Sequence, residues 1–357
     1  MNPVQTLTLA FAPSAGRKKA LRDGLSAVVR VGDELWLAND ESLSLERLTL
    51  AGDRAGEHVS FPLADCLDLP APPDGDDFEE ADIEGLDWAG GCLWLTGSHS
   101  LKRKNPKPGD KPEKARKDLA KLSRDGNRYL LARIPLVEEA GRLRPVRRAG
   151  GAHAARLDGD AEGNALTRAL ADDPHLAPFL ALPGKDNGFD IEGLAVAGER
   201  LFLGLRGPVL RGWAVILELA PVAAPPDRLA LKPLEGERPY LKHFLHLGGL
   251  GVRDLCRRGD DLLILAGPTM DLDGPVRVLR WPGGARPHQD GAWVPAEALE
   301  AVRDIPYGRG DDHAEGMTLF SAEDNAHPAL LVVYDAASTA RKRGESGVLA
   351  DVLPLPV

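Results

Sequence analysis

Cysteine is scarce in this chain of 357 residues, which contains only Cys66, Cys92 and Cys256. Their number is odd, their spacings are unrelated, and no Cys-x-x-Cys pair occurs. Such cysteines are typical of buried, reduced thiols rather than of a reactive pair. The sequence therefore does not predict a catalytic cysteine.

The N-terminal residues predict a first strand rather than a signal peptide, and the chain contains no long hydrophobic run. No cationic region precedes the first apolar stretch, which Thr6, Thr8 and Pro13 interrupt. No apolar run approaches the roughly 20 residues that span a bilayer. A formal net charge of -10 argues against nucleic acid and anionic membrane surfaces as partners. We expect a cytoplasmic protein that binds neither of them, and the sequence does not indicate its oligomeric state.

Several common catalytic motifs are absent as well. The sequence has no G-x-S-x-G elbow, no H-E-x-x-H motif, no Walker loop and no dinucleotide fingerprint. Any chemistry must therefore come from a less familiar arrangement of side chains, and no nucleotide cofactor is predicted.

What the chain does contain is an internal repeat. Its pattern is Glu-Gly-apolar, three spacers, a glycine-containing turn and then alternating apolar residues. Period-two apolar residues on both sides of a short polar turn predict a β-hairpin. The fifth copy has a longer turn at 321–328. The copies begin at residues 26, 84, 192, 253 and 315.

At least one more strand-like run follows each hairpin, and four-stranded units of about 40 to 60 residues predict an all-β fold, the β-propeller. The second and third copies begin 108 residues apart, nearly two periods, so we expect five blades, with six as the alternative. Residues 1–357 would form one domain, in which the N-terminal strand 5–12 closes the last blade. Two insertions are expected, a basic one at 102–128 and a helical or loop one at 150–180.

In a propeller the innermost strands line a central channel, so the Glu-Gly positions form a ring. Three glutamates that meet at one axis repel one another unless something compensates their charge. A Ca²⁺ or Mg²⁺ ion, the guanidinium of Arg253, or a raised carboxyl pKa would each do so. On the first alternative the metal ligands are Glu84, Glu192 and Glu315, with Asp82 beside them. The ring residues are Ser26, Glu84, Glu192, Arg253 and Glu315.

Other polar residues gather at the same mouth of the channel. His99 and His313, whose ordinary pKa lies near neutrality, and Asp190 are the candidates for proton transfer. A small anionic or polyhydroxylated ligand is the expected partner. Each of these residues also has a purely structural interpretation, as a hydrogen-bonded histidine or an ion pair that holds a loop. The candidate ligand-binding residues are Arg206, Arg211, Arg253, Lys102, Arg103 and Asn187.

The segments KDNGFDIEGLAV and GLRGPVLRGWA, within residues 185–219, resemble an uncharacterised bacterial family known only as a domain of unknown function. The D-x-E-G-L strand is also similar to that of the esterase-like and phytase-like propellers. An inner-strand Glu-Gly is similar to the metal-binding glutamate of the gluconolactonase and senescence-marker propellers. That likeness implies a metal ligand at Glu84, Glu192 or Glu315, although the remaining lactonase ligands have no clear match here.

Two functions follow from these observations. The first is metal-assisted hydrolysis of an ester, lactone or phosphoester, with the cation polarising the substrate and activating water. The second is a non-catalytic ligand-binding or scaffold propeller with a network of carboxylates and arginines. A cation about 2.3 to 2.6 Å from two of the glutamates would favour the first. Direct bridges from Arg253 to the glutamates would favour the second.

Overall fold

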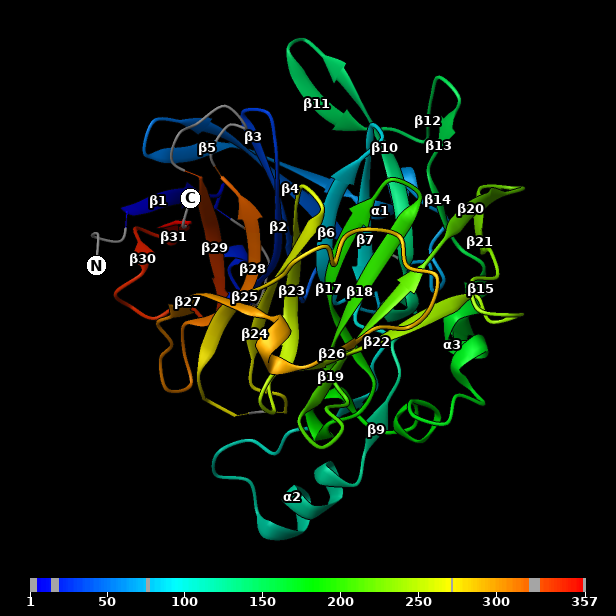
Figure 1. Cartoon of the computed structure of the whole chain (residues 1–357). Helices are drawn as coiled ribbons and strands as arrows, with labels where there is room; N and C mark the ends of the chain where they lie inside the picture. Colours follow the sequence, from blue (N-terminus) through cyan, green and yellow to red (C-terminus); the bar gives the residue numbers. More distant parts are fainter. Residues whose placement is uncertain (1–4, 14–18, 75–77, 271, 321–327, 356–357) are drawn as a thin grey trace.

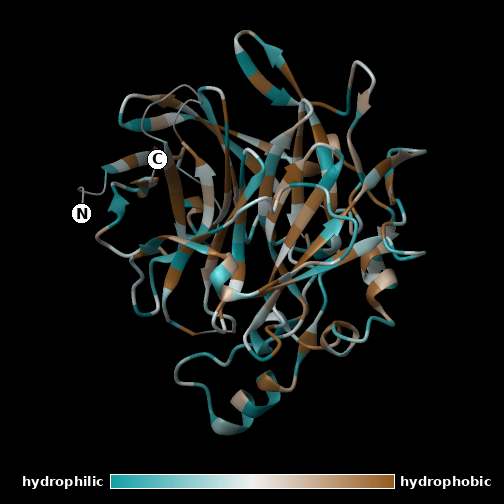
Figure 2. Cartoon of the chain, viewed as in Figure 1, coloured by the Kyte–Doolittle hydropathy of each residue, from teal (hydrophilic) through white to brown (hydrophobic). Residues whose placement is uncertain are grey.

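The computed structural model describes residues 5–13, 19–74, 78–270, 272–320 and 328–355. The strands form mainly antiparallel β-sheets arranged around a common axis, as in a β-propeller (Figure 1). Hydrophobic residues lie along the strands and hydrophilic ones in the connections (Figure 2). Within the described ranges, no helix combines the length and the apolar character needed to cross a membrane.

We name five groups of strands sheets 1 to 5, and each begins with a hairpin. Sheets 1 and 5 are parts of one nine-stranded sheet, joined where β5 pairs with β1. Sheet 1 contains β2 (Leu25–Val31), β3 (Glu34–Asn39), β4 (Ser44–Ala51) and β5 (Arg54–Pro62). Sheet 2 contains β6 (Ile83–Ala89), β7 (Cys92–Gly97), β10 (Leu131–Glu139) and β14 (Ala155–Leu157). Sheet 3 contains β17 (Asp190–Ala197), β18 (Arg200–Gly207), β19 (Trp213–Leu219) and β22 (Tyr240–His246). Sheet 4 contains β23 (Gly251–Arg258), β24 (Asp261–Gly267), β25 (Val276–Trp281) and β27 (Glu300–Ile305). Sheet 5 contains β28 (His313–Leu319), β29 (Ala329–Asp335), β31 (Gly347–Pro354) and β1 (Gln5–Ala10).

Shorter elements extend these sheets or connect them. The short strands are β8 (Lys102–Arg103), β9 (Leu122–Ser123), β11 (Arg142–Pro145), β12 (Arg148–Ala149), β13 (Ala152–His153), β15 (Gly159–Asp160), β16 (Gly163–Asn164), β20 (Pro221–Ala224), β21 (Arg228–Leu231), β26 (Trp293–Val294) and β30 (Lys342–Arg343). The α-helices are α1 (Leu63–Cys66), α2 (Pro112–Leu119) and α3 (Ala165–Leu170). The 3-10 helices are Leu21–Asp23, Gly126–Tyr129, Ala177–Phe179, Gly184–Asp186 and Ala296–Ala298.

The five inner strands form a closed ring. Strand β2 packs against β6, β6 against β17, β17 against β23, β23 against β28, and β28 against β2. The N-terminal strand β1 pairs antiparallel with β31 of sheet 5 and, through Thr8 and Leu9, parallel with β5 of sheet 1. Strand β1 thus lies between β31 and β5, which removes an open sheet edge.

The hydrophobic core is divided into clusters that lie between neighbouring sheets. Trp36 of sheet 1 packs with Ile83 of sheet 2, and Phe202 of sheet 3 packs with Val252 of sheet 4. The other clusters join sheets 2 and 3, sheets 4 and 5, and sheets 5 and 1. Each sheet thus buries both of its faces, which explains nearly continuous apolar runs such as Leu262–Leu265.

The insertions agree with the prediction only in part. The basic segment forms the pair β8 and β9 with α2 between them, and it projects at the lower end in Figure 1. The segment 150–180 contains α3, but its strand β14 also joins sheet 2, so it is not wholly an insertion. Three residues are too few to show a period-two pattern, which is why the sequence did not reveal β14. Of the predicted turn 321–328, residues 321–327 lie outside the described ranges.

Candidate functional site

A β-bulge interrupts each inner strand near the mouth of the channel. The extra residue of the bulge has no partner on the neighbouring strand of the hairpin, and its strand bends there. Each of these extra residues is a predicted ring residue, so the bulges aim these five side chains at one place. The bulged residues are Ser26, Glu84, Glu192, Arg253 and Glu315.

The glycine after each ring glutamate permits close contact between inner strands. A Cβ on Gly85 would lie 2.6 Å from the Cβ of Leu194 on the next inner strand. On Gly316 it would lie 3.0 Å from the Cα of Ala27. The backbones of neighbouring inner strands therefore approach closely at these glycines, which keeps the ring narrow.

Two arginines compensate most of the negative charge in the ring. The Nε of Arg253 lies 3.0 Å from Oε2 of Glu192, and its Nη2 bonds Glu315. The Nη1 of Arg206, at the end of β18, lies 2.7 Å from Oε1 of Glu192, while its Nη2 bonds Asp190. Burial lowers the pKa of both guanidinium groups, but the surrounding carboxylates raise it more, so both stay charged.

A third arginine holds the acid at the start of β6. The Nη1 of Arg128 lies 2.7 Å from Oδ2 of Asp82 and also donates to the hydroxyls of Ser98 and Ser100, at 3.2 and 2.7 Å. Burial lowers the pKa of this arginine, but the charges of Asp82 and the other nearby carboxylates raise it more. Three of the four predicted metal ligands, Asp82, Glu192 and Glu315, thus have an arginine partner.

Glu84 is different, because no described residue forms an ion pair or hydrogen bond with its carboxyl group. Burial raises its pKa well above the ordinary value, and the nearby charges of Asp82 and Glu192 raise it further. Burial also raises the pKa of Asp40 to about 7, despite Lys19, and that of Asp190 to about 6, despite Arg206. Carboxyl groups that titrate near neutrality therefore surround the ring.

A cavity of about 450 Å³ opens above these groups. Its volume is that of a typical small-molecule pocket, about 300 to 1,000 Å³. The insertion supplies one wall through Arg103 and Leu119. Nine acidic residues and six Lys or Arg residues line this mouth cavity. They are Asp40, Glu41, Glu80, Asp82, Glu84, Asp186, Asp190, Glu315 and Asp335, with Lys102, Arg103, Lys104, Arg128, Lys185 and Arg206.

Among the predicted ligand-binding residues, Lys102, Arg103, Arg206 and Arg253 lie at the mouth, and three of them line the mouth cavity. Lys102 pairs with Glu80 and Asp125 at 2.6 Å, and Arg103 pairs with Asp186 at 2.6 Å. These cations therefore shape the wall of the cavity and already have acidic partners.

Asn187 and Arg211 do not line it. The Oδ1 of Asn187 accepts hydrogen bonds from the backbone of Val209 and the hydroxyl of Thr269, at 3.1 and 3.2 Å, and so holds the neighbouring loops. Arg211 is exposed, with a left-handed backbone (φ 51°). Neither residue reaches the groups that surround the ring.

The two predicted histidines have different surroundings. His99 is buried, and its Nδ1 donates to the carbonyl of Gly97 at 2.8 Å while its Nε2 accepts from Nδ2 of Asn164 at 2.7 Å. Burial lowers its pKa to about 4, so the imidazole is neutral. Both of its nitrogens are hydrogen-bonded, and neither is free for proton transfer to a ligand. His313 is partly exposed, and its Nε2 lies 3.4 Å from Asp273 beside the mouth. Proton transfer by His313 remains a prediction.

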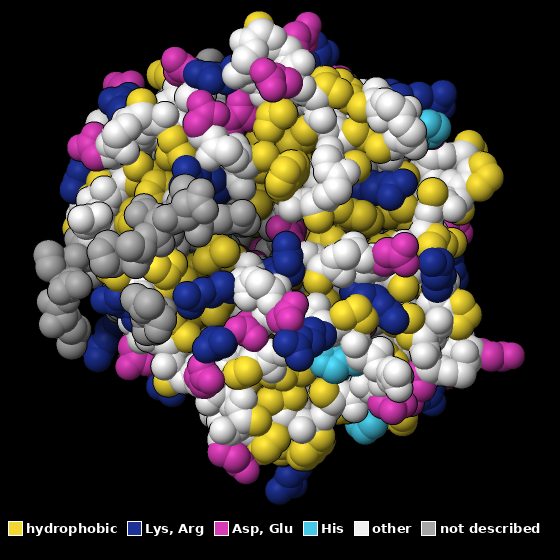
Figure 3. Space-filling model, turned by 45° about the horizontal axis from the view of Figure 1, so that its top comes forward, with side chains coloured by type: hydrophobic (Ala, Val, Ile, Leu, Met, Phe, Trp, Pro, Cys, Tyr) yellow, Lys and Arg dark blue, Asp and Glu magenta, His cyan; other side chains and the backbone are white. Residues whose placement is uncertain are grey.

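The sequence placed Asp40 and Asp335 among the polar residues of the mouth without giving them a role, and it did not identify Arg128 as a site residue. Arg128 stands at the end of the basic insertion, where a run of charges is typical of a solvated loop. Asp335 ends the second strand of its hairpin and Asp40 directly follows the second strand of another, and this similar position is the signal that identifies them. On the opposite side of the molecule, acidic and basic side chains are intermingled (Figure 3).

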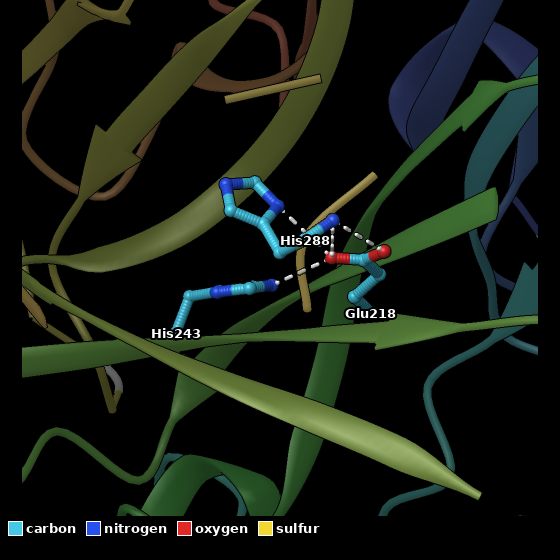
Figure 4. A group of neighbouring side chains, drawn as sticks. All are labelled: Glu218, His243 and His288. Atoms are coloured by element: carbon cyan, nitrogen blue, oxygen red, sulfur yellow. Dashed lines mark hydrogen bonds and ion pairs between the residues drawn. The ribbon is translucent and has the colours of Figure 1, made fainter. Parts of the chain in front are cut away.

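One group of three side chains within the described ranges has the spacing of a metal site, and it lies away from the mouth. Ligand atoms of Glu218, His243 and His288 all lie within 4.8 Å of one another (Figure 4). However, Nδ1 of His243 accepts a hydrogen bond from the backbone N–H of Ala292 at 2.9 Å, so Nε2 must carry the proton that it donates to Glu218. A metal would need that nitrogen free, and Arg200 lies 3.4 Å from the same carboxylate. The donor set fits a hydrogen-bonded network and not a metal ion.

Solved structures with a similar arrangement share little sequence with this chain. A glutaminyl cyclase from Myxococcus xanthus is 9% identical, with a TM-score of 0.41 and full coverage of both chains. The β-propeller domain of Cps50 (Swd1) from Myceliophteria thermophila is 10% identical, with a TM-score of 0.31 and coverage of 92% of this chain and 83% of that chain. The PQQ-bound aldose sugar dehydrogenase from Streptomyces coelicolor is 10% identical, with a TM-score of 0.37 and coverage of 99% of both.

A search of curated proteins gives no match to this chain. A family match nevertheless covers nearly all of the sequence, from residue 24 to residue 351. It includes every ring residue and both segments that resemble an uncharacterised family. The chain thus belongs to the family described as "Protein of unknown function (DUF3616)".

Proposed function

We propose that the protein is a single-domain, five-bladed propeller that binds a small polyhydroxylated molecule in the mouth cavity. The observation that carries this proposal is the lining, in which carboxylates stand beside guanidinium and ammonium groups. A hydroxyl group both donates and accepts hydrogen bonds, so a polyol matches such a wall better than an ion of either sign. The nine acids against six cations favour a polyol over an anion.

The carboxylate and arginine network supports binding without a metal. Arg253 bridges Glu192 and Glu315, and Arg206 bridges Glu192 and Asp190. These contacts supply the positive charge that a divalent cation would otherwise bring to the ring. These contacts favour the second predicted function, the binding propeller, over the first, metal-assisted hydrolysis.

Hydrolysis of an ester or lactone is a second candidate, favoured by the unpartnered carboxyl of Glu84. Asp190, ionised above its pKa of about 6, would take a proton from water. The water oxygen would then bond to the acyl carbon as the acyl–oxygen bond breaks. Glu84, protonated because burial raises its pKa, would give its proton to the departing alcohol oxygen. Arg206 would orient the acyl group.

The test combines calorimetric titration of sugars and polyols with a panel of chromogenic esters, lactones and phosphates. The key variant is Glu84→Gln, because glutamine keeps the shape of the neutral carboxyl but cannot transfer a proton. Glu199→Gln is the matched control, since the Glu199 side chain is 89% exposed and lies in the β17–β18 turn, away from the mouth. Each titration is run with EDTA and again with Ca²⁺.

Polyol binding that is weakened in Glu84→Gln and retained in Glu199→Gln is the expected result, with or without EDTA. Ester or lactone turnover that falls about 100-fold or more in Glu84→Gln would establish the hydrolase. Binding or turnover that requires Ca²⁺ would overturn the metal-free site. If no polyol binds at millimolar concentration, the proposed ligand class is wrong.

A further inference from the structure

A second cleft adjoins the mouth cavity. It has a volume of about 260 Å³ and is bounded by the β24–β25 connection and by the segment between β27 and β28. Four residues line both spaces, so the two spaces lie directly side by side. The shared residues are Lys185, Arg206, Glu315 and Asp335.

The walls of the second cleft differ chemically from those of the mouth cavity. Leu272, Tyr307 and Met270 line it, and they are 58%, 48% and 38% exposed. Pro268 and Val276 add further apolar surface. Ten large apolar side chains are exposed in the described part of the chain, and three of them meet in this cleft. Such a concentration of exposed apolar surface marks a binding surface.

The four residues that the two spaces share are all charged. The polar pair of His313 and Asp273, at 3.4 Å, lies in the second cleft itself, beside its apolar residues. The shared part is therefore charged, while the large exposed apolar side chains line only the second cleft, so a ligand that spans both spaces needs one polar and one largely apolar end.

We infer that the natural ligand is amphipathic, with a hydroxyl-rich head in the mouth cavity and an alkyl or aryl group in the second cleft. This inference rests on the proposed function, because it assigns the head to the same cavity. The link between the two parts, an ester or an ether, would lie beside Arg206 and Glu315. The ligand class is thus an apolar derivative of a sugar or related polyol.

Calorimetric titration of the full chain with two glucosides tests this inference. Methyl β-glucoside supplies the head alone, and octyl β-glucoside, used below its micelle concentration, adds the apolar chain. We expect octyl glucoside to bind at least about tenfold more tightly, because several methylene groups leave water. The variant Leu272→Ser/Tyr307→Ser should reduce this ratio toward one. Trp88→Ser is the control, since Trp88 is 44% exposed in another sheet, in the β6–β7 hairpin.

Equal affinity of the two glucosides in the wild type would overturn the inference and leave the proposed function intact. The inference would also be overturned, and the proposed function left intact, if octyl glucoside binding is lost in the double variant but unchanged in Glu84→Gln. In that case the second cleft would bind the octyl group independently of the mouth cavity. Failure of both glucosides to bind would count against the polyol head, and with it against the inference.

Discussion

Arg253 occupies the ring position that is glutamate in three other sheets, and this exchange of charge organises the mouth. Its guanidinium lies between Glu192 and Glu315, while Arg206 approaches Glu192 from the adjacent strand. Glu84, two inner strands away, is left outside these pairs. The ring therefore combines a neutralised part with one carboxyl group that is available to a ligand.

Removing the guanidinium tests this arrangement. In Arg253→Met, Glu315 loses its arginine partner and Glu192 keeps only Arg206, so we expect the free energy of unfolding to fall by about 3 to 5 kcal/mol. In the control Arg277→Met an exposed arginine leaves Asp304, 3.7 Å away, and the change should stay within about 0.5 kcal/mol. Urea unfolding measures both. If the Arg253 variant is as stable as the control, the ion pairs of Arg253 contribute nothing to the stability of the protein.

Glu218 gives the protein a specific sensitivity to acid. Burial raises its pKa, but hydrogen bonds from His243 and His288 lower it more, to about 2 from 4.5. Ionised Glu218 therefore contributes about 3 kcal/mol to the free energy of unfolding. This contribution is present above pH 4.5 and is lost as the pH falls toward 2. Glu218→Gln should be less stable at pH 7 and should lose less stability over this range. Urea unfolding at several pH values measures the slope, and a slope equal to that of wild type contradicts the assignment.

The inner strands depend on two local features, a bulge and a small residue after it. The bulge turns one side chain toward the axis, and the small residue lets the neighbouring strand approach. Where Asp254 replaces glycine in β23, its carboxylate accepts the backbone N–H of Met317 on β28 at 2.7 Å. The contact between inner strands is thus maintained there by a hydrogen bond.

Alanine at Gly85 should disturb this packing. The added Cβ would lie 2.6 Å from the Cβ of Leu194 and 3.1 Å from its backbone nitrogen, so the two inner strands must separate. We expect Gly85→Ala to destabilise the protein by about 1 to 3 kcal/mol. Gly151→Ala is the control, because no heavy atom lies within 4 Å of its Cβ position. Thermal unfolding that is the same for both variants would exclude the packing argument.

The whole molecule is closed by pairing between the two ends of the chain. Strand β1 completes sheet 5 beside β31 and also contacts β5 of sheet 1. Leu9 of this strand is fully buried in the cluster between these sheets. The stability of the ring therefore depends on a short N-terminal strand whose partners lie far away in the sequence.

Leu9→Ala should consequently destabilise the entire ring. A buried leucine truncated to alanine costs about 2 to 5 kcal/mol. Gln5→Ala, at an exposed position of the same strand, should change stability little. Scanning calorimetry should show one shifted transition for Leu9→Ala. Two separate transitions would show that sheet 5 unfolds independently and that the closure does not couple the ring.

The repeated hairpins and the ring residues could be predicted because they repeat a pattern in the chain. The partners of the ring residues could not. Whether Glu192 faces a metal or Arg206 depends on side-chain positions that period-two patterning does not determine. His99 illustrates the same limit, because its burial beside Asn164, 65 residues away, has no local signal. The apolar cleft was also missed, since Met270, Leu272 and Tyr307 are isolated residues in connecting segments.

The bulges have a consequence for how this protein can be redesigned. Since each ring residue is the one without a cross-strand partner, substituting it changes no pairing between strands. Ser26 already shows that a small neutral side chain is accepted there, with its hydroxyl donating to the carbonyl of Ile83 at 2.5 Å. A combinatorial library at the codons of Ser26 and Glu84, which form no ion pair with a described residue, would therefore vary the chemistry of the ring while the scaffold keeps its strand register.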